Sequence, residues 1–319
     1  MKTVSIQLLM AALVLTVAGA GCANEKSSTT SPAAVEVDVP LPELNPSTLA
    51  TDEAMAKRVI FMAYEEVNNQ LGSFRFVAES RLKISHDDTV LHKQDDSYLV
   101  AQNANGDFHV ELESPPISQA NVTLIGDTVY IQHNWGRMRH KPRREDDHVE
   151  QWCEVGFTSL SQALGLFYTH LTLQSPTKAK VGKRSALRYK LGIGKGTRTN
   201  VSATPHVATK SLGLPISPRA KWRENARPTK LNGSIWVDSK TGVLLKAAFD
   251  GTLELPSDQE QMPNKMQLSY KSEMSRIAKP QSFGAPGKPV AEFKRSKPPR
   301  NVTSFYGKPA APKADPAKK

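Results

Sequence analysis

Between residue 74 and residue 278, apolar and polar side chains alternate with a period of two over most of the chain. Successive side chains of a β-strand point to opposite faces, so this pattern predicts a sheet with one apolar and one wet face. Asn105-Gly106 and Gly126-Asp127 are typical of tight turns between antiparallel neighbours. About ten such strands in one open, twisted sheet are expected to curl. We therefore predict a β-rich α+β fold with a curved antiparallel sheet, an unclosed half-barrel of about ten strands.

Two segments carry apolar residues at helical spacing instead. Thr51 with Asp52 and Glu53 predicts an N-cap and an acidic first turn, and an apolar stripe from Met55 follows. A second stripe runs from Leu160 to Leu171. Two helices must then cover one face of a large sheet. If side chains fill the concavity the domain is packed, and if they do not, an apolar ligand can complete the core.

The stretch GSIWVDSKTGVLLKAAFDGTLEL, residues 233–255, predicts a hairpin with Gly242 in the left-handed position of a three-residue loop. Counting back from the loop pairs Val237 with Leu245 and Ile235 with Ala247. The aliphatic residues then share the apolar face. Trp236 is expected on the opposite face, with its ring against the stem of Lys246.

The order of these segments resembles a known family. "GSFRFVAESRLKI" follows a leading helix, paired short strands and a middle helix come next, and "RYKLGIG" and "GSIWVDSKTGVLLK" follow. Over about residues 50–278 this order is similar to the LolA/LolB-type periplasmic lipoprotein carriers and the LppX and RseB-type domains. The resemblance implies an unclosed half-barrel that binds a lipid or acyl chain. The cavity lining would be Phe74, Phe76, Leu82, Phe108, Val110, Leu112, Leu187, Tyr189, Leu191, Ile235, Val237, Leu245, Phe249, Met266, Leu268 and Tyr270.

The N-terminus predicts export. Residues 1–21 combine Lys2, an apolar stretch and small residues, as in a secretory signal. In one interpretation Cys22 is a lipobox cysteine that is lipidated, with residues 22–46 as a flexible tether. In the other, cleavage after Ala18-Gly19-Ala20 leaves Cys22 to pair with Cys153, the only other cysteine. We favour lipidation, and the absence of Asp after Cys22 favours the periplasmic face of the outer membrane over the inner membrane.

The positive charge of the chain, +11 overall, is concentrated in two segments. Residues 177–230 hold 14 Lys or Arg and one acid, and residues 279–319 hold 10 Lys or Arg and two acids. We predict a basic disordered insertion at 195–230 in a single domain, 47–278, and a Pro/Lys-rich disordered tail at 279–319. Either segment is a solvated loop or a contact for anionic envelope polymer, for which Arg219, Lys221, Trp222 and Arg223 are the candidates.

No sequence motif indicates catalysis. Gly192-Ile-Gly194-Lys-Gly196 is not followed by a helix, so it does not predict a phosphate loop. His133, His140 and His148 lack metal-ligand spacing, and Cys153 has no adjacent base, which predicts a buried structural thiol. We expect no catalytic residue, metal or cofactor.

Two functions remain open. The first is a membrane-anchored envelope lipoprotein that binds a lipid or an acylated protein without catalysis. The alternative is an envelope interaction or sensor scaffold, whose basic insertion and tail bind anionic polymer or a partner protein. Nucleic acid is not expected as a partner outside the cytoplasm.

Overall fold

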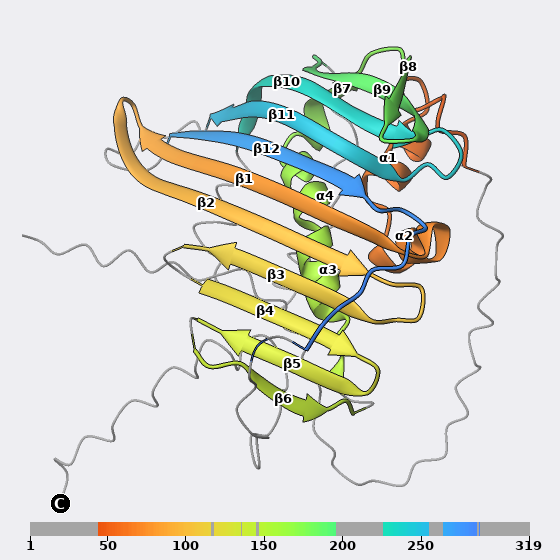
Figure 1. Cartoon of the computed structure of the whole chain (residues 1–319). Coiled ribbons are helices and arrows are strands. Elements are labelled where there is room, and N and C mark those ends of the chain that lie inside the picture. The colour runs from red at the N-terminus through yellow and green to blue at the C-terminus, as the bar shows by residue number, and fades with distance from the viewer. Residues whose placement is uncertain are drawn as a thin grey trace, which may run out of the picture. The chain divides into compact units, whose positions relative to one another are not determined.

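The computed structural model describes residues 44–115, 118–134, 136–144, 147–195, 226–254, 264–285 and 287, all within one compact unit (Figure 1). Twelve strands of this described part form a single antiparallel sheet, in the order β6-β5-β4-β3-β2-β1-β12-β11-β10-β9-β7, and β8 also pairs with β9. The strands are β1 Phe74–His86, β2 Thr89–Gln102, β3 Phe108–Ser114, β4 Ser118–Ile125, β5 Thr128–His133, β6 Arg139–Pro142, β7 Leu171–Leu173, β8 Thr177–Val181, β9 Arg184–Ile193, β10 Arg227–Asp238, β11 Leu244–Glu254 and β12 Lys265–Ser275. The predicted fold class, a β-rich unclosed antiparallel sheet covered by helices, is confirmed.

The sheet has a simple topology with one long crossing. Strands β1 to β6 follow one another to one edge. The helical segment between β6 and β7 then carries the chain to the other edge, from which it returns through β9, β10 and β11. The last strand, β12, lies in the middle of the sheet between β1 and β11. In its pairing with β1, Arg75 lies opposite Ser275 and Ser85 opposite Lys265.

The covering helices are shorter and more numerous than the sequence pattern predicts. They are α1 Glu53–Ile60, α2 Tyr64–Leu71, α3 Gln151–Phe157 and α4 Ser159–Gly165, and a 3-10 turn, η2 Tyr168–His170, follows α4. Asp52, one residue after the expected Thr51, is the N-cap of α1. It has an extended backbone, and its side chain accepts a hydrogen bond from the Met55 amide.

Two glycines allow the helical segment to pack closely on the sheet. A Cβ at Gly156 of α3 would lie 2.7 Å from Val100 Cγ2, and a Cβ at Gly251 of β11 would lie 2.2 Å from Cζ of Phe167. Phe167 is fully buried and meets Phe249 edge to face, with ring centroids 6.4 Å apart. Such close approach is a usual reason for glycine inside a helix or strand.

The β10–β11 hairpin follows the expected face assignment with one register change. Gly242 has a φ of +73°, as the loop requires. Ile235 pairs with Ala247 and Trp236 with Lys246, as predicted. Val237, however, pairs with Leu244 and not with Leu245, because the register shifts between Trp236 and Val237. This irregularity lets both leucines be buried.

Ordered contacts extend beyond the domain limits expected at 47 and 278. Leu44 packs against Gly242, and the Pro46 carbonyl accepts a hydrogen bond from the Tyr189 hydroxyl. After β12 the chain crosses the ends of β1 and β2, where the Gln281 amide bonds to Asn103 Oδ1 at 2.8 Å. The predicted basic insertion, residues 195–230, overlaps strand β10, which begins at Arg227.

Candidate binding site on the concave face

The predicted cavity-lining residues divide into a covered group and a partly exposed group. Twelve are buried, none more than 7% exposed: Phe74, Phe76, Phe108, Val110, Tyr189, Leu191, Ile235, Val237, Leu245, Phe249, Leu268 and Tyr270. Four are only half-buried: Leu82, Leu112, Leu187 and Met266. The alternation therefore assigned all sixteen to core positions or to positions packed against the core, and their role in ligand contact stays a prediction.

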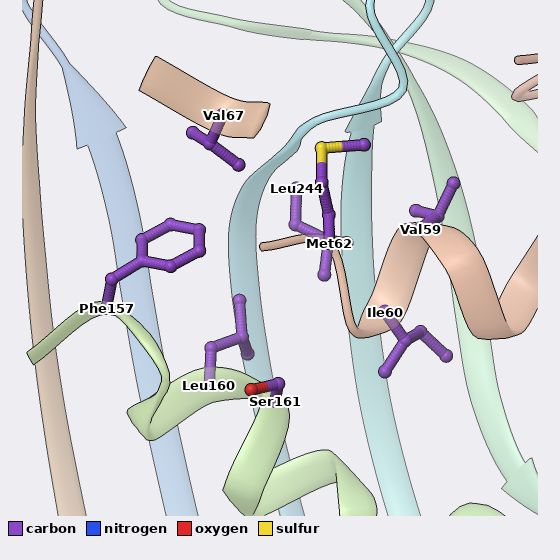
Figure 2. Close-up of a pocket in the computed structure, with 8 residues that line it drawn as sticks. All are labelled: Val59, Ile60, Met62, Val67, Phe157, Leu160, Ser161 and Leu244. Carbon is purple, nitrogen blue, oxygen red and sulfur yellow. The ribbon is translucent and has the colours of Figure 1, made fainter. Parts of the chain in front are cut away.

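A small pocket lies between the helices and the sheet. Its lining is Val59, Ile60, Met62, Val67, Phe157, Leu160, Ser161 and Leu244 (Figure 2). These side chains converge from α1, α2 and the connection between them, from α3 and α4, and from β11. The volume of the pocket that the centre of a water molecule can occupy is about 10 Å³. That is about enough for a single water molecule, whereas sites for drug-sized ligands measure roughly 300–1,000 Å³.

The concave face continues beyond the described helices. The β1–β2 hairpin extends well past α3 and α4 (Figure 1). On this part of the face Leu82 lies across from Gln94, and Met266 lies across from Ile84. Leu112, across from Tyr98, lies at the border with α3, where a Cβ at Gly156 would be 3.1 Å from Leu112 Cδ2. Leu82, Leu112, Met266 and Ile84 are half-buried. This region, which we call the open half, presents apolar surface that is only partly covered.

A hydrogen-bonded cluster lies on the same face, at the open half. Gln94 Nε2 donates to Asp96 Oδ1 at 2.9 Å and to Ser114 Oγ at 2.8 Å. Ser114 Oγ donates to Asp96 Oδ1 at 2.5 Å, and the Tyr98 hydroxyl lies 3.4 Å from Asp96 Oδ2. Burial, and then the neighbouring Asp96 carboxylate, raise the pKa of Tyr98, so the phenol stays protonated and acts as a donor.

The acceptors of this cluster are not all used. Gln94 is 7% exposed, and its Oε1 has no hydrogen-bond partner among the described residues. Among those residues, no Lys or Arg forms an ion pair with Asp96. This cluster was not predicted from the sequence, although the sequence contains a signal for it. Counting back in twos from the buried Val100 places Tyr98, Asp96 and Gln94 on the apolar face, where a carboxylate is unusual.

Three further polar contacts join the helices to the sheet. Ser159 Oγ lies 2.9 Å from the Tyr270 hydroxyl, and burial raises the pKa of Tyr270. The Tyr64 hydroxyl donates to Gln102 Oε1 at 2.6 Å, and the Cys153 thiol donates to the same oxygen at 3.9 Å. Cys153 is fully buried, which raises its pKa to about 12. The predicted burial of this thiol is confirmed, and the raised pKa leaves little of it as the nucleophilic thiolate near neutral pH.

Trp236 lies on the outer face of the sheet, as predicted. The Arg188 guanidinium lies 5.2 Å from the centroid of the Trp236 ring, and the Lys246 ammonium lies 5.8 Å from it. Lys246 also forms a 2.6 Å ion pair with Glu273. Trp236 therefore packs between two cations on the face opposite the core and does not line the cavity.

Several predicted residues lie outside the described part of the chain. These are Cys22 and the candidate anionic-surface contacts Arg219, Lys221, Trp222 and Arg223. Within the described part, no three or more His, Cys, Asp or Glu side chains are grouped as a metal site would require. Across the same residues, no helix has the length and apolar character needed to span a membrane.

Comparison with known proteins gives matches among solved structures only. No family model and no curated protein sequence matches the chain. Among solved structures, a LolA superfamily protein from Nitrosomonas europaea is 11% identical, with a TM-score of 0.21, and the match covers 73% of this chain and 94% of that one. A DUF1329 family protein from Desulfovibrio piger is also 11% identical, with a TM-score of 0.20, and the match covers 72% of this chain and 94% of that one.

A third match is the complex of MucA and MucB from Pseudomonas aeruginosa. It is 12% identical, with a TM-score of 0.23, and covers 68% of this chain. The chain spans little more than half the length of that protein, 56%. The first of these matches is named for the LolA superfamily, which the sequence resembles. At these identities the likeness is one of fold alone.

Proposed function

We propose that this protein is a non-catalytic binding protein of the cell envelope that holds a lipid or acyl chain on the open half of its concave face. The observation that carries the proposal is the half-buried apolar surface of Leu82, Leu112 and Met266, which the described helices leave partly exposed. An alkyl chain laid across these side chains would remove its own surface and theirs from water, at about 25 cal/mol per Å².

The pocket in Figure 2 supports this placement, because it is far too small for an acyl chain. A chain bound between the helices and the sheet would have to displace buried side chains such as Phe157 and Leu160. A chain on the open half displaces none of them. The helices then act as fixed packing that delimits the site.

The envelope location and the anchor are part of the same proposal. The secretory signal at residues 1–21 and the lipobox-like Cys22 support a lipid-anchored protein on the periplasmic face of the outer membrane. Its partner would be a lipid or an acylated protein.

Binding is tested with a matched pair of substitutions. Leu82 and Lys83 are neighbours on β1 that face opposite sides of the sheet, so Leu82→Glu places a carboxylate on the open half and Lys83→Glu places one on the outer face. We expect a fluorescent fatty acid to bind the wild-type protein and Lys83→Glu, and to bind Leu82→Glu at least tenfold more weakly. Native mass spectrometry of protein extracted gently from its own membrane should show bound lipid. Equal binding by both variants, or no binding by the wild type, would contradict the proposal.

A second function is favoured by the charge of two segments. Residues 195–230 and 279–319 are strongly basic and include Arg219, Lys221, Trp222 and Arg223. We propose that they contact anionic envelope polymer or a partner protein, which makes the folded domain a scaffold. Deleting 196–225 and 288–319 should release the protein from isolated envelope polymer at low salt, where charge contacts are strongest. Unchanged retention would count against this role.

A further inference from the structure

The acceptor groups around Asp96 lie on the same face of the sheet as the apolar surface described above, and Gln94 Oε1 is buried there. Asp96, Gln94 and Ser114 come from adjacent strands, and Tyr98 follows Asp96 on the same face of β2. Leu82 on β1 is paired with Gln94 on β2, and Leu112 on β3 is paired with Tyr98 on β2. The polar cluster is therefore bordered by two half-buried leucines.

The chemistry of the cluster determines what it can still bind. Gln94 Nε2, not Oε1, must face Asp96 Oδ1 and Ser114 Oγ, because a carboxylate oxygen needs a donor opposite it. Asp96 Oδ1 already accepts two hydrogen bonds. Among the described residues, Asp96 Oδ2 is approached only by the Tyr98 hydroxyl, at 3.4 Å, and Gln94 Oε1 has no partner. Within that part of the chain, the cluster therefore has acceptor atoms to which no further side chain donates a hydrogen bond.

The charge of the cluster specifies the donor further. Asp96 is half-buried and forms no ion pair with any described Lys or Arg. A carboxylate without a cation in a partly apolar site favours a cationic ligand group, and an ammonium has three donors and no acceptor.

We propose that Asp96, Gln94 and Tyr98 form a subsite for the ammonium group of an amphiphilic ligand whose alkyl chain lies on Leu82 and Leu112. This inference rests on the proposed function, which supplies the binding of the chain, and it adds the class of head group. Asp96 Oδ2 and Gln94 Oε1 accept hydrogen bonds from the ammonium, and the two leucines contact the first methylenes of the chain. The ammonium can belong to a lipid head group or to a simple alkylamine.

The test uses three probes that separate the head group from the chain: dodecylamine, dodecanol and ethylamine, each titrated below its aggregation concentration into the full-length protein by calorimetry. We expect dodecylamine to bind about 10- to 100-fold more tightly than dodecanol, the range of one charge-assisted hydrogen-bond pair. Ethylamine, which lacks the chain, should bind too weakly to measure. Lysophosphatidylethanolamine should bind more tightly than lysophosphatidylglycerol of the same chain length if a lipid head group is recognised.

A matched pair of substitutions assigns the selectivity to the cluster. Asp96→Asn removes the charge on the concave face, and Asp95→Asn removes one on the outer face, where Asp95 is exposed beside Arg81. Both variants should keep the wild-type circular dichroism spectrum. Asp96→Asn should bind dodecylamine and dodecanol equally, and Asp95→Asn should keep the wild-type preference.

The outcomes separate this inference from the function on which it rests. Equal binding of dodecylamine and dodecanol by the wild type would refute the ammonium subsite and leave the proposed lipid binding intact. A preference that survives Asp96→Asn would also refute the subsite. Failure of both long-chain probes to bind would refute the lipid-binding function and the subsite with it.

Discussion

Replacing Gly251 by alanine tests how tightly the helical segment is packed on the sheet. The added Cβ would lie 2.2, 2.5 and 3.0 Å from three atoms of the Phe167 ring. Ordinary contact begins at 3.4 Å, so the shortest contact falls 1.2 Å short. Phe167 is 0% exposed and packs against Phe249, which leaves the ring no free space to enter.

The expected cost follows from these contacts. Overpacking of a closed core costs about 1–3 kcal/mol, and losing the edge-to-face contact with Phe249 adds roughly 0.5–1.5 kcal/mol. We expect Gly251→Ala to lower the free energy of unfolding by about 2–4 kcal/mol. Gly284→Ala is the control, because a Cβ there would meet nothing within 4 Å. Urea denaturation followed by circular dichroism measures both, with an unchanged slope required for the comparison.

A second substitution shows whether the Phe167 ring is the cause. Phe167→Leu shortens the side chain at the point of collision, so Gly251→Ala/Phe167→Leu should be more stable than the sum of the single effects by at least about 1 kcal/mol. Gly251→Ala within about 0.5 kcal/mol of the wild type would refute the packing argument. Additive single effects would show that the clash is relieved elsewhere.

Three other predictions concern single side chains. Hydrogen bonds from Arg184 and from two turn amides outweigh burial and hold the pKa of Asp238 below its ordinary value of 3.8. Because the folded-state pKa is depressed, the carboxylate stabilises the fold above the unfolded-state pKa, and this contribution is lost as the pH falls through the folded-state pKa. Asp238→Asn should therefore cost about 1–2 kcal/mol at pH 7 and progressively less as the pH is lowered below 3.8, as measured by urea denaturation, and a gap that does not narrow with falling pH would contradict this. Cys153 is buried and has a pKa of about 12. In the folded protein at pH 8 it should react with iodoacetamide at under about 1% of the rate measured for the protein unfolded in urea, as followed by peptide mass spectrometry. Equal rates in the two states would contradict its burial. Trp236→Ala should lower the free energy of unfolding by about 2 kcal/mol, since it removes a half-buried ring and its contact with Lys246, and an unchanged urea midpoint would show that the contact contributes nothing.

The period-two pattern was enough to predict the sheet and its faces, because each strand must bury one side. Phe74 and Phe76 on β1, and Phe108 and Val110 on β3, are all 1% exposed or less, as predicted. The register of β10 and β11 was predicted at Trp236 and missed at Val237. Three consecutive apolar residues, Val243, Leu244 and Leu245, do not show by themselves which of them follows the bulge.

The extent of the helical cover could not be predicted from the sequence. The first apolar stripe predicts one helix, but the chain breaks between Ile60 and Tyr64, and the bend places Met62 at the small pocket. How much of the sheet such helices cover depends on three-dimensional packing and not on periodicity. For this reason Leu82 and Phe76 look equivalent in the sequence, although Phe76 is 1% exposed and Leu82 is half-buried.

The neighbouring positions of β1 and β12 have a consequence for how the protein is made. Every other pair of long strands is close in the sequence, but Arg75 and its partner Ser275 are separated by 200 residues. The middle of the sheet cannot form until Ser275 has been synthesised, and pairing across such a separation is slow. Until then β1 and β11 each present an unpaired edge at the centre of the sheet, which is a site for aggregation. A chain cut short before residue 264 should accumulate in that state, and a circular permutant that joins the two ends of this seam should fold faster than the natural order.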